Sequence, residues 1–240
     1  MQLRAFRVRA AALLAIALIV SAFAFPAAAG AHNVSKRDAS FVQSNQGAAI
    51  PAFIYLGAKH MVTGYDHLAF LVGVVFFLYR LKDIVLYVSL FTVGHSITLL
   101  ACVLGGIHAN SYLIDAIIGL SVVYKAFDNM DGFRRFLGFE PNTKLAVLIF
   151  GLFHGFGLAT KLQELDLSKN GLITNIISFN VGVEIGQVLA LTAVLIALSI
   201  WRTRSGFLRQ AFAANTVLMT VGFLLVGYQV AGYFVASHQA

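Results

Sequence analysis

Six apolar runs follow one another along this chain, and each is long enough to cross a lipid bilayer as a helix. Their approximate limits are 62–79, 83–104, 110–127, 145–161, 172–200 and 212–236. A helix needs roughly 20 residues to cross ~30 Å of hydrocarbon. Because hydrocarbon leaves unpaired backbone groups without partners, such runs fold as helices with internal hydrogen bonds. The chain is therefore predicted to be an all-α integral membrane protein whose core is one bundle of six transmembrane helices.

Composition supports a membrane protein and excludes other classes. The chain is 59% hydrophobic and only 11% charged, which leaves too little polar surface for a soluble globule. Its net charge of +7 comes from residues placed between the apolar runs, a pattern of membrane topology, and no nucleic-acid binding is expected. Cys102 is the only cysteine, so an internal disulfide and a thiolate cluster are both excluded. Any metal site must use nitrogen and oxygen ligands.

Residues 1–31 have the features of a secretory signal peptide. Arg4, Arg7 and Arg9 precede an apolar run that ends in the small residues PAAAGAH. Cleavage after Ala29 or Ala31 fits this pattern, and an uncleaved leader would add a seventh helix. Residues 32–61 are expected to form a periplasmic segment, in which IPAFIYLGAKH is a short amphipathic helix at the membrane interface. Residues 62–240 form the transmembrane domain.

Basic residues set the expected orientation in a bacterial inner membrane. A secreted N-terminus puts the loops after spans one, three and five in the cytoplasm, and these loops hold most of the basic residues. The cytoplasmic set is Arg80, Lys82, Lys125, Arg134, Arg135, Lys144, Arg202, Arg204 and Arg209. With six spans, the mature N-terminus and the C-terminus are both periplasmic.

Polar residues inside the spans gather in the half that faces outward under this topology. Each ionisable group costs ~2.5 kcal/mol or more at mid-bilayer unless it is paired or solvated, so a cluster on separate helices indicates a shared site. Glycines spaced four apart, at Gly151 and Gly155 and at Gly182 and Gly186, allow helices to approach closely. The candidate metal ligands are His60, Asp66, His67, His95, His154 and Glu184.

Further polar residues are predicted to support these ligands. Residues three, four and seven apart share a helix face, which groups Asn180 and Gln187 with Glu184, and Thr92 and Ser96 with His95. Asp115 lies in the outward part of span three, where it also suits a helix amino end. Imidazole and carboxylate ligands favour a divalent transition metal such as Ni²⁺, Co²⁺, Zn²⁺ or Fe²⁺.

Five motifs in order resemble the HupE/UreJ family of membrane proteins. They are GYDHLAFL, FTVGHSITL, IIGLSVVYKA, FGLFHGFGLA and FNVGVEIGQ, and the resemblance covers about residues 55–190. Proteins of that family are associated with hydrogenase and urease gene clusters and are described as nickel or cobalt permeases. The resemblance implies nickel or cobalt as the metal and the six candidate ligands as the family's polar positions. Asp115 departs from the glutamate that many relatives have there.

Three functions remain open at this stage. A permease must release its ion to the cytoplasm, yet the inner halves of spans four and five are almost wholly apolar, so transport would require a rocking bundle. An intramembrane hydrolase facing the periplasm would use Glu184 as general base and Ser96 to orient or donate. A metallochaperone would pass its ion to a periplasmic metal-delivery or enzyme-maturation partner. The expected partners are otherwise the metal ion and the lipid bilayer.

Overall fold

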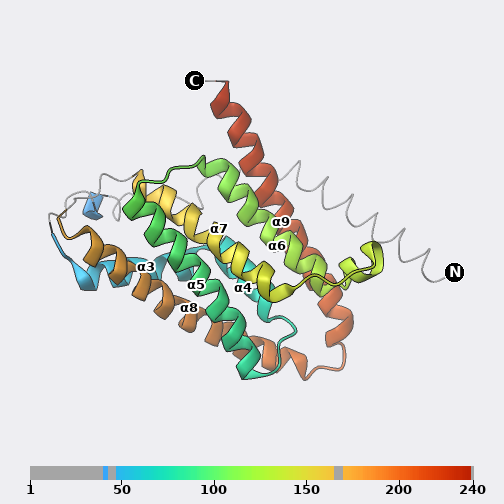
Figure 1. Cartoon of the computed structure of the whole chain (residues 1–240). Helices are drawn as coiled ribbons and strands as arrows, with labels where there is room; N and C mark the ends of the chain where they lie inside the picture. The colour runs from blue at the N-terminus through green and yellow to red at the C-terminus, as the bar shows by residue number, and fades with distance from the viewer. Residues whose placement is uncertain (1–39, 43–46, 165–169, 239–240) are drawn as a thin grey trace.

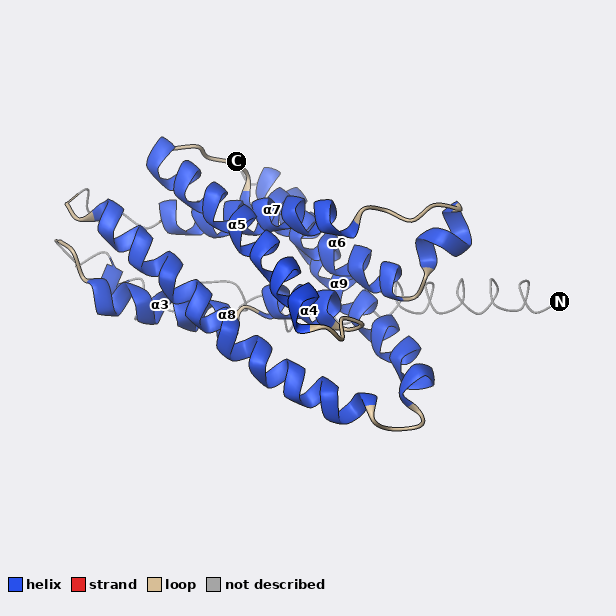
Figure 2. Ribbon diagram, turned by 60° about the horizontal axis from the view of Figure 1, so that its bottom comes forward, coloured by secondary structure: helices blue, strands red, loops and turns tan. Residues whose placement is uncertain are grey.

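The computed structural model describes residues 40–42, 47–164 and 170–238, and these ranges form helices and loops with no strand (Figures 1 and 2). The predicted signal peptide lies outside the described residues. The helices are α3 (Ile50–Thr63), α4 (Tyr65–Val75), α5 (Leu81–Gly105), α6 (Ser111–Asn129), α7 (Thr143–Gln163), α8 (Leu172–Arg202) and α9 (Phe207–Ser237), with one π-helical turn, η1 (Phe133–Leu137), before α7.

Four of these helices are long and apolar enough to cross a membrane. They are α5, α7, α8 and α9, with 25, 21, 31 and 31 residues. Helix α6 has 19 residues and contains Asp115, Lys125 and Asp128, while α4 has only 11 residues. The structure therefore supports an all-helical, multi-pass membrane protein, and the count of six spans remains a prediction.

The first predicted span, residues 62–79, differs most from the structure, because this stretch contains the end of α3 and all of α4, with a break at Gly64. Helices α3 and α4 are separated by Gly64 alone, and together they run parallel to α8. Ile54 contacts Gly182, and Ala58 contacts Gly186. Val75 accepts a hydrogen bond from Arg202, so the number of residues that separates the contacting positions in the sequence stays nearly constant along both helices. The segment expected to lie at the interface is thus packed lengthwise against α8 (Figure 2).

Glycines allow the closest helix contacts, as the sequence predicted. A Cβ atom added at Gly155 would overlap the carbonyl oxygen of His95, and one at Gly182 would overlap the carbonyl oxygen of Ile54. These two contacts hold α7 against α5 and α8 against α3. Helix α9 packs antiparallel to α6, where Gly222 lies against Val123. In the described part of the chain, three helix pairs, α3 with α8, α5 with α7 and α6 with α9, pack around the short helix α4.

The outer surface of the bundle is apolar. On α8, Ile176 and Val183 are buried, whereas Ile177, Val188 and Leu189 are exposed. A soluble protein rarely exposes so much contiguous apolar surface, but hydrocarbon accepts it. The arrangement fits a bilayer around the bundle.

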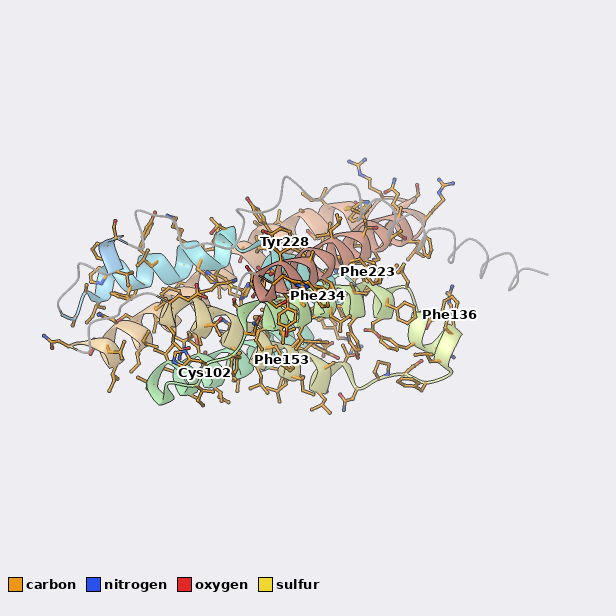
Figure 3. The ribbon with its side chains drawn as sticks, turned by 90° about the horizontal axis from the view of Figure 1, so that it is seen from above. Cys102, Phe136, Phe153, Phe223, Tyr228 and Phe234 are labelled. Atoms are coloured by element: carbon orange, nitrogen blue, oxygen red, sulfur yellow. The ribbon has the colours of Figure 1, made fainter. Side chains whose placement is uncertain are left out.

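The two ends of the bundle can be defined by α8. We call the end at which α8 begins the upper end, and the end at which α8 finishes the lower end. Figure 3 shows Cys102, on the upper part of α5, near one end and Phe136, in the turn before α7, near the other. The upper end corresponds to the predicted periplasmic side.

Candidate metal centre

Four histidine rings from four helices meet near the middle of the bundle. His67 of α4 is central: its ring centre lies 4.8 Å from that of His154 on α7, 5.9 Å from that of His95 on α5 and 5.1 Å from that of His60 on α3. The side chains of His67, His95 and His154 are only 3%, 1% and 0% exposed. His60 and His67 were predicted in the outward-facing half of the spans, and their rings gather with those of His95 and His154, which stand near the middle of α5 and α7.

The hydrogen bonds of these rings leave nitrogen atoms available. His154 Nδ1 donates to the carbonyl oxygen of Phe150 at 2.7 Å, which leaves its Nε2 with a lone pair. Nε2 of His67, Nε2 of His154 and both ring nitrogens of His95 are buried without a hydrogen-bond partner in the described structure. Each such buried group costs about 1–3 kcal/mol. A cation bound at this point would remove that cost for several nitrogens at once.

Asp66 orients the central histidine. Its Oδ1 lies 3.0 Å from His67 Nδ1, and the carboxylate is 2% exposed. An ionised carboxylate accepts the proton of Nδ1, so Nε2 becomes the ligand atom, as in many metal sites. Asp66 is also in the first turn of α4, where the helix dipole favours a negative charge. The dipole role and the orienting role are therefore compatible.

Gly64 makes this geometry possible at the break between α3 and α4. A Cβ atom there would lie 3.3 Å from His67 Nδ1, 3.4 Å from Asp66 Oδ1 and 3.0 Å from the carbonyl oxygen of His60. A side chain at this position would crowd both the histidine and its carboxylate. Membrane transporters often bind substrates where a helix is interrupted near the middle of the membrane.

The distances between rings are suitable for a shared ion. Two imidazoles bound to one metal with ~2.0–2.1 Å metal–nitrogen bonds at a tetrahedral angle have ring centres roughly 5 Å apart. Among the described residues, however, no three His, Cys, Asp or Glu side chains are arranged to hold an ion as they stand. The donor types and spacing fit a transition metal, and small rotations of the rings are needed to bring their nitrogens to one point.

A layer of phenylalanines lies directly below the histidines. Phe70, Phe91 and Phe150 each stand one helical turn from His67, His95 and His154 respectively, and always on the lower side, because α4 runs downward while α5 and α7 run upward. The ring centre of Phe70 lies 5.5 Å from that of Phe91 and 5.7 Å from that of Phe150. We call these three residues the aromatic floor. It separates the histidines from the lower half of the bundle.

The predicted supporting residues of α5 and α8 do pair with one another. Gln187 Nε2 donates to Thr92 Oγ1 at 3.0 Å, and Ser96 Oγ donates to Asn180 Oδ1 at 3.3 Å. These two bonds link α8 to the helix that carries His95. Glu184 lies apart, since its side chain is exposed on α8 while Asn180 and Gln187 are buried. The structure therefore does not bring Glu184 to the buried histidines.

Asp115 belongs to a separate ionic group. Its Oδ2 lies 3.0 Å from Lys161 Nζ on α7, and Gln229 Nε2 of α9 donates to the same oxygen at 3.3 Å. The carboxylate is 7% exposed, so this pair is largely shielded from solvent. Asp115 thus joins α6 to α7 and α9, and its charge is matched by a lysine in the last turn of α7.

Several polar residues near the lower end make contacts that the sequence did not predict. Asn129 of α6 and Asn215 of α9 are hydrogen-bonded to each other at 2.9 Å, and Arg202 donates to the end of α4. Lys125, predicted to belong to the cytoplasmic set of basic residues, is 7% exposed and forms an ion pair with Asp128 at 2.6 Å. Asparagines in or next to apolar runs were the signal for the polar contacts at the lower end. A phenylalanine one helical turn from His67, His95 and His154 was the signal for the aromatic floor.

Comparison with known proteins identifies the chain's relatives at the level of a family. A family model described as HupE / UreJ protein matches residues 36–237. No curated protein and no solved structure matched the chain. The family is associated with membrane handling of nickel or cobalt, in transport or in an accessory role. Since the match extends over most of the sequence, this chain belongs to the HupE/UreJ family.

Proposed function

We propose that this protein is a nickel or cobalt permease of the bacterial inner membrane, which takes up its ion from the periplasm. Under this proposal the six crossing elements are α3–α4 together, α5, α6, α7, α8 and α9, and the upper end faces the periplasm. The mature N-terminus and the C-terminus are then periplasmic. The directions of the helix pairs support this arrangement, because each successive element runs opposite to the one before it.

The observation that carries the proposal is the set of buried imidazole nitrogens without hydrogen-bond partners. His67, His95 and His154 come from three helices, and Asp66 orients the central ring. We assign these four residues to the binding of the transported ion, with His60 at the upper side of the site. Neutral imidazoles with one carboxylate suit Ni²⁺ and Co²⁺, and they also accept Zn²⁺ or Fe²⁺.

The transport step follows from the broken helix. An ion bound by residues of α4, α5 and α7 is separated from the lower end by the aromatic floor, so it can leave downward only if these helices shift. The break at Gly64 is a natural place for such a movement. The backbone of Gly64 is extended, so the helix is not continuous between α3 and α4. Movement of α4 relative to α3 would expose the ion to one side at a time.

The hydrolase alternative receives less support from the geometry. Its proposed base, Glu184, has an exposed side chain, and Ser96 is hydrogen-bonded to Asn180. The metallochaperone alternative uses the same histidines and differs only in lacking a route to the lower end. Metal flux therefore separates a permease from an accessory protein.

Metal binding by the purified protein tests the proposed site. Ni²⁺ binding is measured by titration calorimetry on wild-type protein and on the His95→Ala and His154→Ala variants. Both variants should lose binding, whereas His108→Ala, which changes an exposed loop histidine, should bind as the wild type does. Equal binding by all four proteins would overturn the assignment of the site.

Flux through reconstituted vesicles tests the permease itself. Vesicles that contain the protein and an internal metal-sensitive dye should report Ni²⁺ entry, and the His154→Ala protein should report none. Tight Ni²⁺ binding without entry would instead support the accessory role.

A further inference from the structure

The lower end of α4 needs an explanation of its own. This helix has 11 residues and is about 16 Å long at ~1.5 Å per residue, so it is much shorter than the bundle around it. The last carbonyl groups of any helix lack partners within the helix. In hydrocarbon those groups must be paired by other means. The backbone amides of Phe76 and Leu78 donate to the carbonyl oxygens of Gly73 and Val75 at 3.4 and 3.1 Å, and side chains of neighbouring helices complete the closure of this end.

Three neighbouring helices provide these side chains. Asn129 Nδ2, from α6, donates to the carbonyl oxygen of Gly73 at 2.8 Å. Arg202 Nη2, from α8, donates to the carbonyl oxygens of Val75 and Phe76 at 2.7 and 2.6 Å. Asn215, from α9, accepts the second hydrogen bond of Asn129. We call Asn129 and Arg202 the clasp.

The clasp places a positive charge where a departing cation would arrive. The carboxyl end of a helix carries a partial negative charge, and its free carbonyl groups attract cations. An ion that leaves the histidines downward along α4 reaches the carbonyl groups of residues 73–76, about 12 Å below His67 at the same helical rise. Arg202 already occupies two of those carbonyls, and its guanidinium also lies 4.5 Å from the ring centre of Tyr79.

We infer that the clasp is the lower gate of the permease, closed in this structure, and that it opens when Arg202 and Asn129 leave the end of α4. This inference rests on the proposed transport function. The closed gate blocks the ion in two ways, since the guanidinium repels it and also occupies the oxygen atoms that would receive it. Withdrawal of the guanidinium frees those oxygens for the departing ion.

Water access to Val74 tests the gate without any need for transport. Val74 is 2% exposed and lies in the last turn of α4. In a Cys102→Ala background, a cysteine introduced by Val74→Cys is treated with a hydrophilic maleimide in detergent. Adding Arg202→Met should increase the labelling rate of the introduced cysteine about ten-fold or more, because the end of α4 then loses its hydrogen bonds from a charged donor. Arg204→Met, which removes an exposed charge nearby, should leave the rate unchanged.

A second variant guards against misfolding. Asn129→Ala should also increase labelling, and the folded state of each variant is checked by Ni²⁺ binding at the histidines, which should stay within about two-fold of wild type because those ligands remain intact. If Arg202→Met and Asn129→Ala lower the unfolding temperature but leave labelling unchanged, the clasp is only a helix cap and the inference is wrong.

Passive Ni²⁺ efflux from loaded vesicles provides the second readout. The Arg202→Met protein should release Ni²⁺ faster than wild type, and unchanged efflux in an actively transporting protein would overturn the gate. If wild-type vesicles show no flux at all, the permease proposal fails, while maleimide labelling still reports whether the clasp controls access.

Discussion

Both ends of α4 bring polar side chains into the bundle, fully buried at the amino end and partly buried at the carboxyl end, and they differ in how those groups are paired. At the amino end, His67 and its neighbours His95 and His154 keep buried nitrogens without hydrogen-bond partners in the described structure. At the carboxyl end, Asn129 and Arg202 donate to the carbonyl groups of the helix, and only Nε of Arg202 is left without a partner among these donors in the described structure. Buried polarity inside a membrane therefore does not by itself mark a binding site. Unfilled hydrogen-bonding capacity, gathered from several helices, is the better indicator.

Removal of a histidine should give the largest difference between the two ends. We expect His67→Ala to weaken Ni²⁺ binding by more than ~100-fold, because loss of a ligand should exceed the 10–100-fold cost of losing a supporting residue. Asn129→Ala, at the other end of α4, should change the dissociation constant by less than about two-fold, since distant sites act independently. Titration calorimetry measures both. Similar losses in the two variants would show that the ends are not distinct.

Replacement of the orienting carboxylate should have the next largest effect. Asp66→Asn keeps the size of the side chain but removes the charge that fixes the His67 tautomer. The expected loss of Ni²⁺ affinity is ~10–100-fold. As a matched change, Asp128→Asn near the lower end should leave the affinity as it is in the wild type. Full affinity in the Asp66→Asn protein would reduce Asp66 to a partner of the helix dipole.

Glycine substitutions compare the packing around the two ends. Gly155→Ala would force a methyl group into the backbone carbonyl of His95, whereas a methyl group at Gly73 meets the flexible side chains of Lys125 and Leu218 at 3.1 and 3.2 Å. Gly155→Ala should lower the free energy of unfolding by ~1–3 kcal/mol, and Gly73→Ala by less than ~1 kcal/mol. Thermal unfolding in detergent gives the ranking. The reverse order would contradict the close packing of α5 and α7.

The smallest effect is expected from Glu184, although its sequence context made it a candidate ligand. Its exposed position on α8 implies that Glu184→Gln changes Ni²⁺ affinity by less than about two-fold, because the carboxylate is exposed whereas His67, His95 and His154 are buried. Calorimetry on this variant and on Gln187→Ala tests whether the exposed and the buried face of α8 differ in their effect on Ni²⁺ affinity, because the side chain of Gln187 is buried on the same helix. A large loss in Glu184→Gln alone would show that the exposed face of α8 contributes to the site.

Much of the fold could be predicted because hydrophobic length and glycine spacing act locally. The helices from α5 to α9 lie within a few residues of the predicted spans, and Gly155 and Gly182 make the predicted close contacts. The break at Gly64 could not be predicted in the same way. Residues 50–61 look amphipathic alone, and only packing against α8 shows that they lie in line with α4 along the bundle.

The residue types of the site could be predicted from the sequence, but the position of these residues along the bundle and the side chains that they contact could not. Histidines in apolar runs indicated a cluster, and the structure brings His60, His67, His95 and His154 together. The sequence could not show that Asp115 faces Lys161, because that pair depends on how α6 packs on α7. Helical spacing likewise grouped Glu184 with Gln187, whereas in the bundle one side chain is exposed and the other buried.

X-ray absorption at the nickel K-edge tests the central claim most directly. Purified protein loaded with one equivalent of Ni²⁺ should show nitrogen and oxygen ligands, together with the outer-shell scattering of imidazole rings from His67, His95 and His154. The imidazole scattering should decrease in the His154→Ala protein. A spectrum of oxygen ligands alone, identical in wild type and His154→Ala, would contradict a histidine metal centre at the break between α3 and α4.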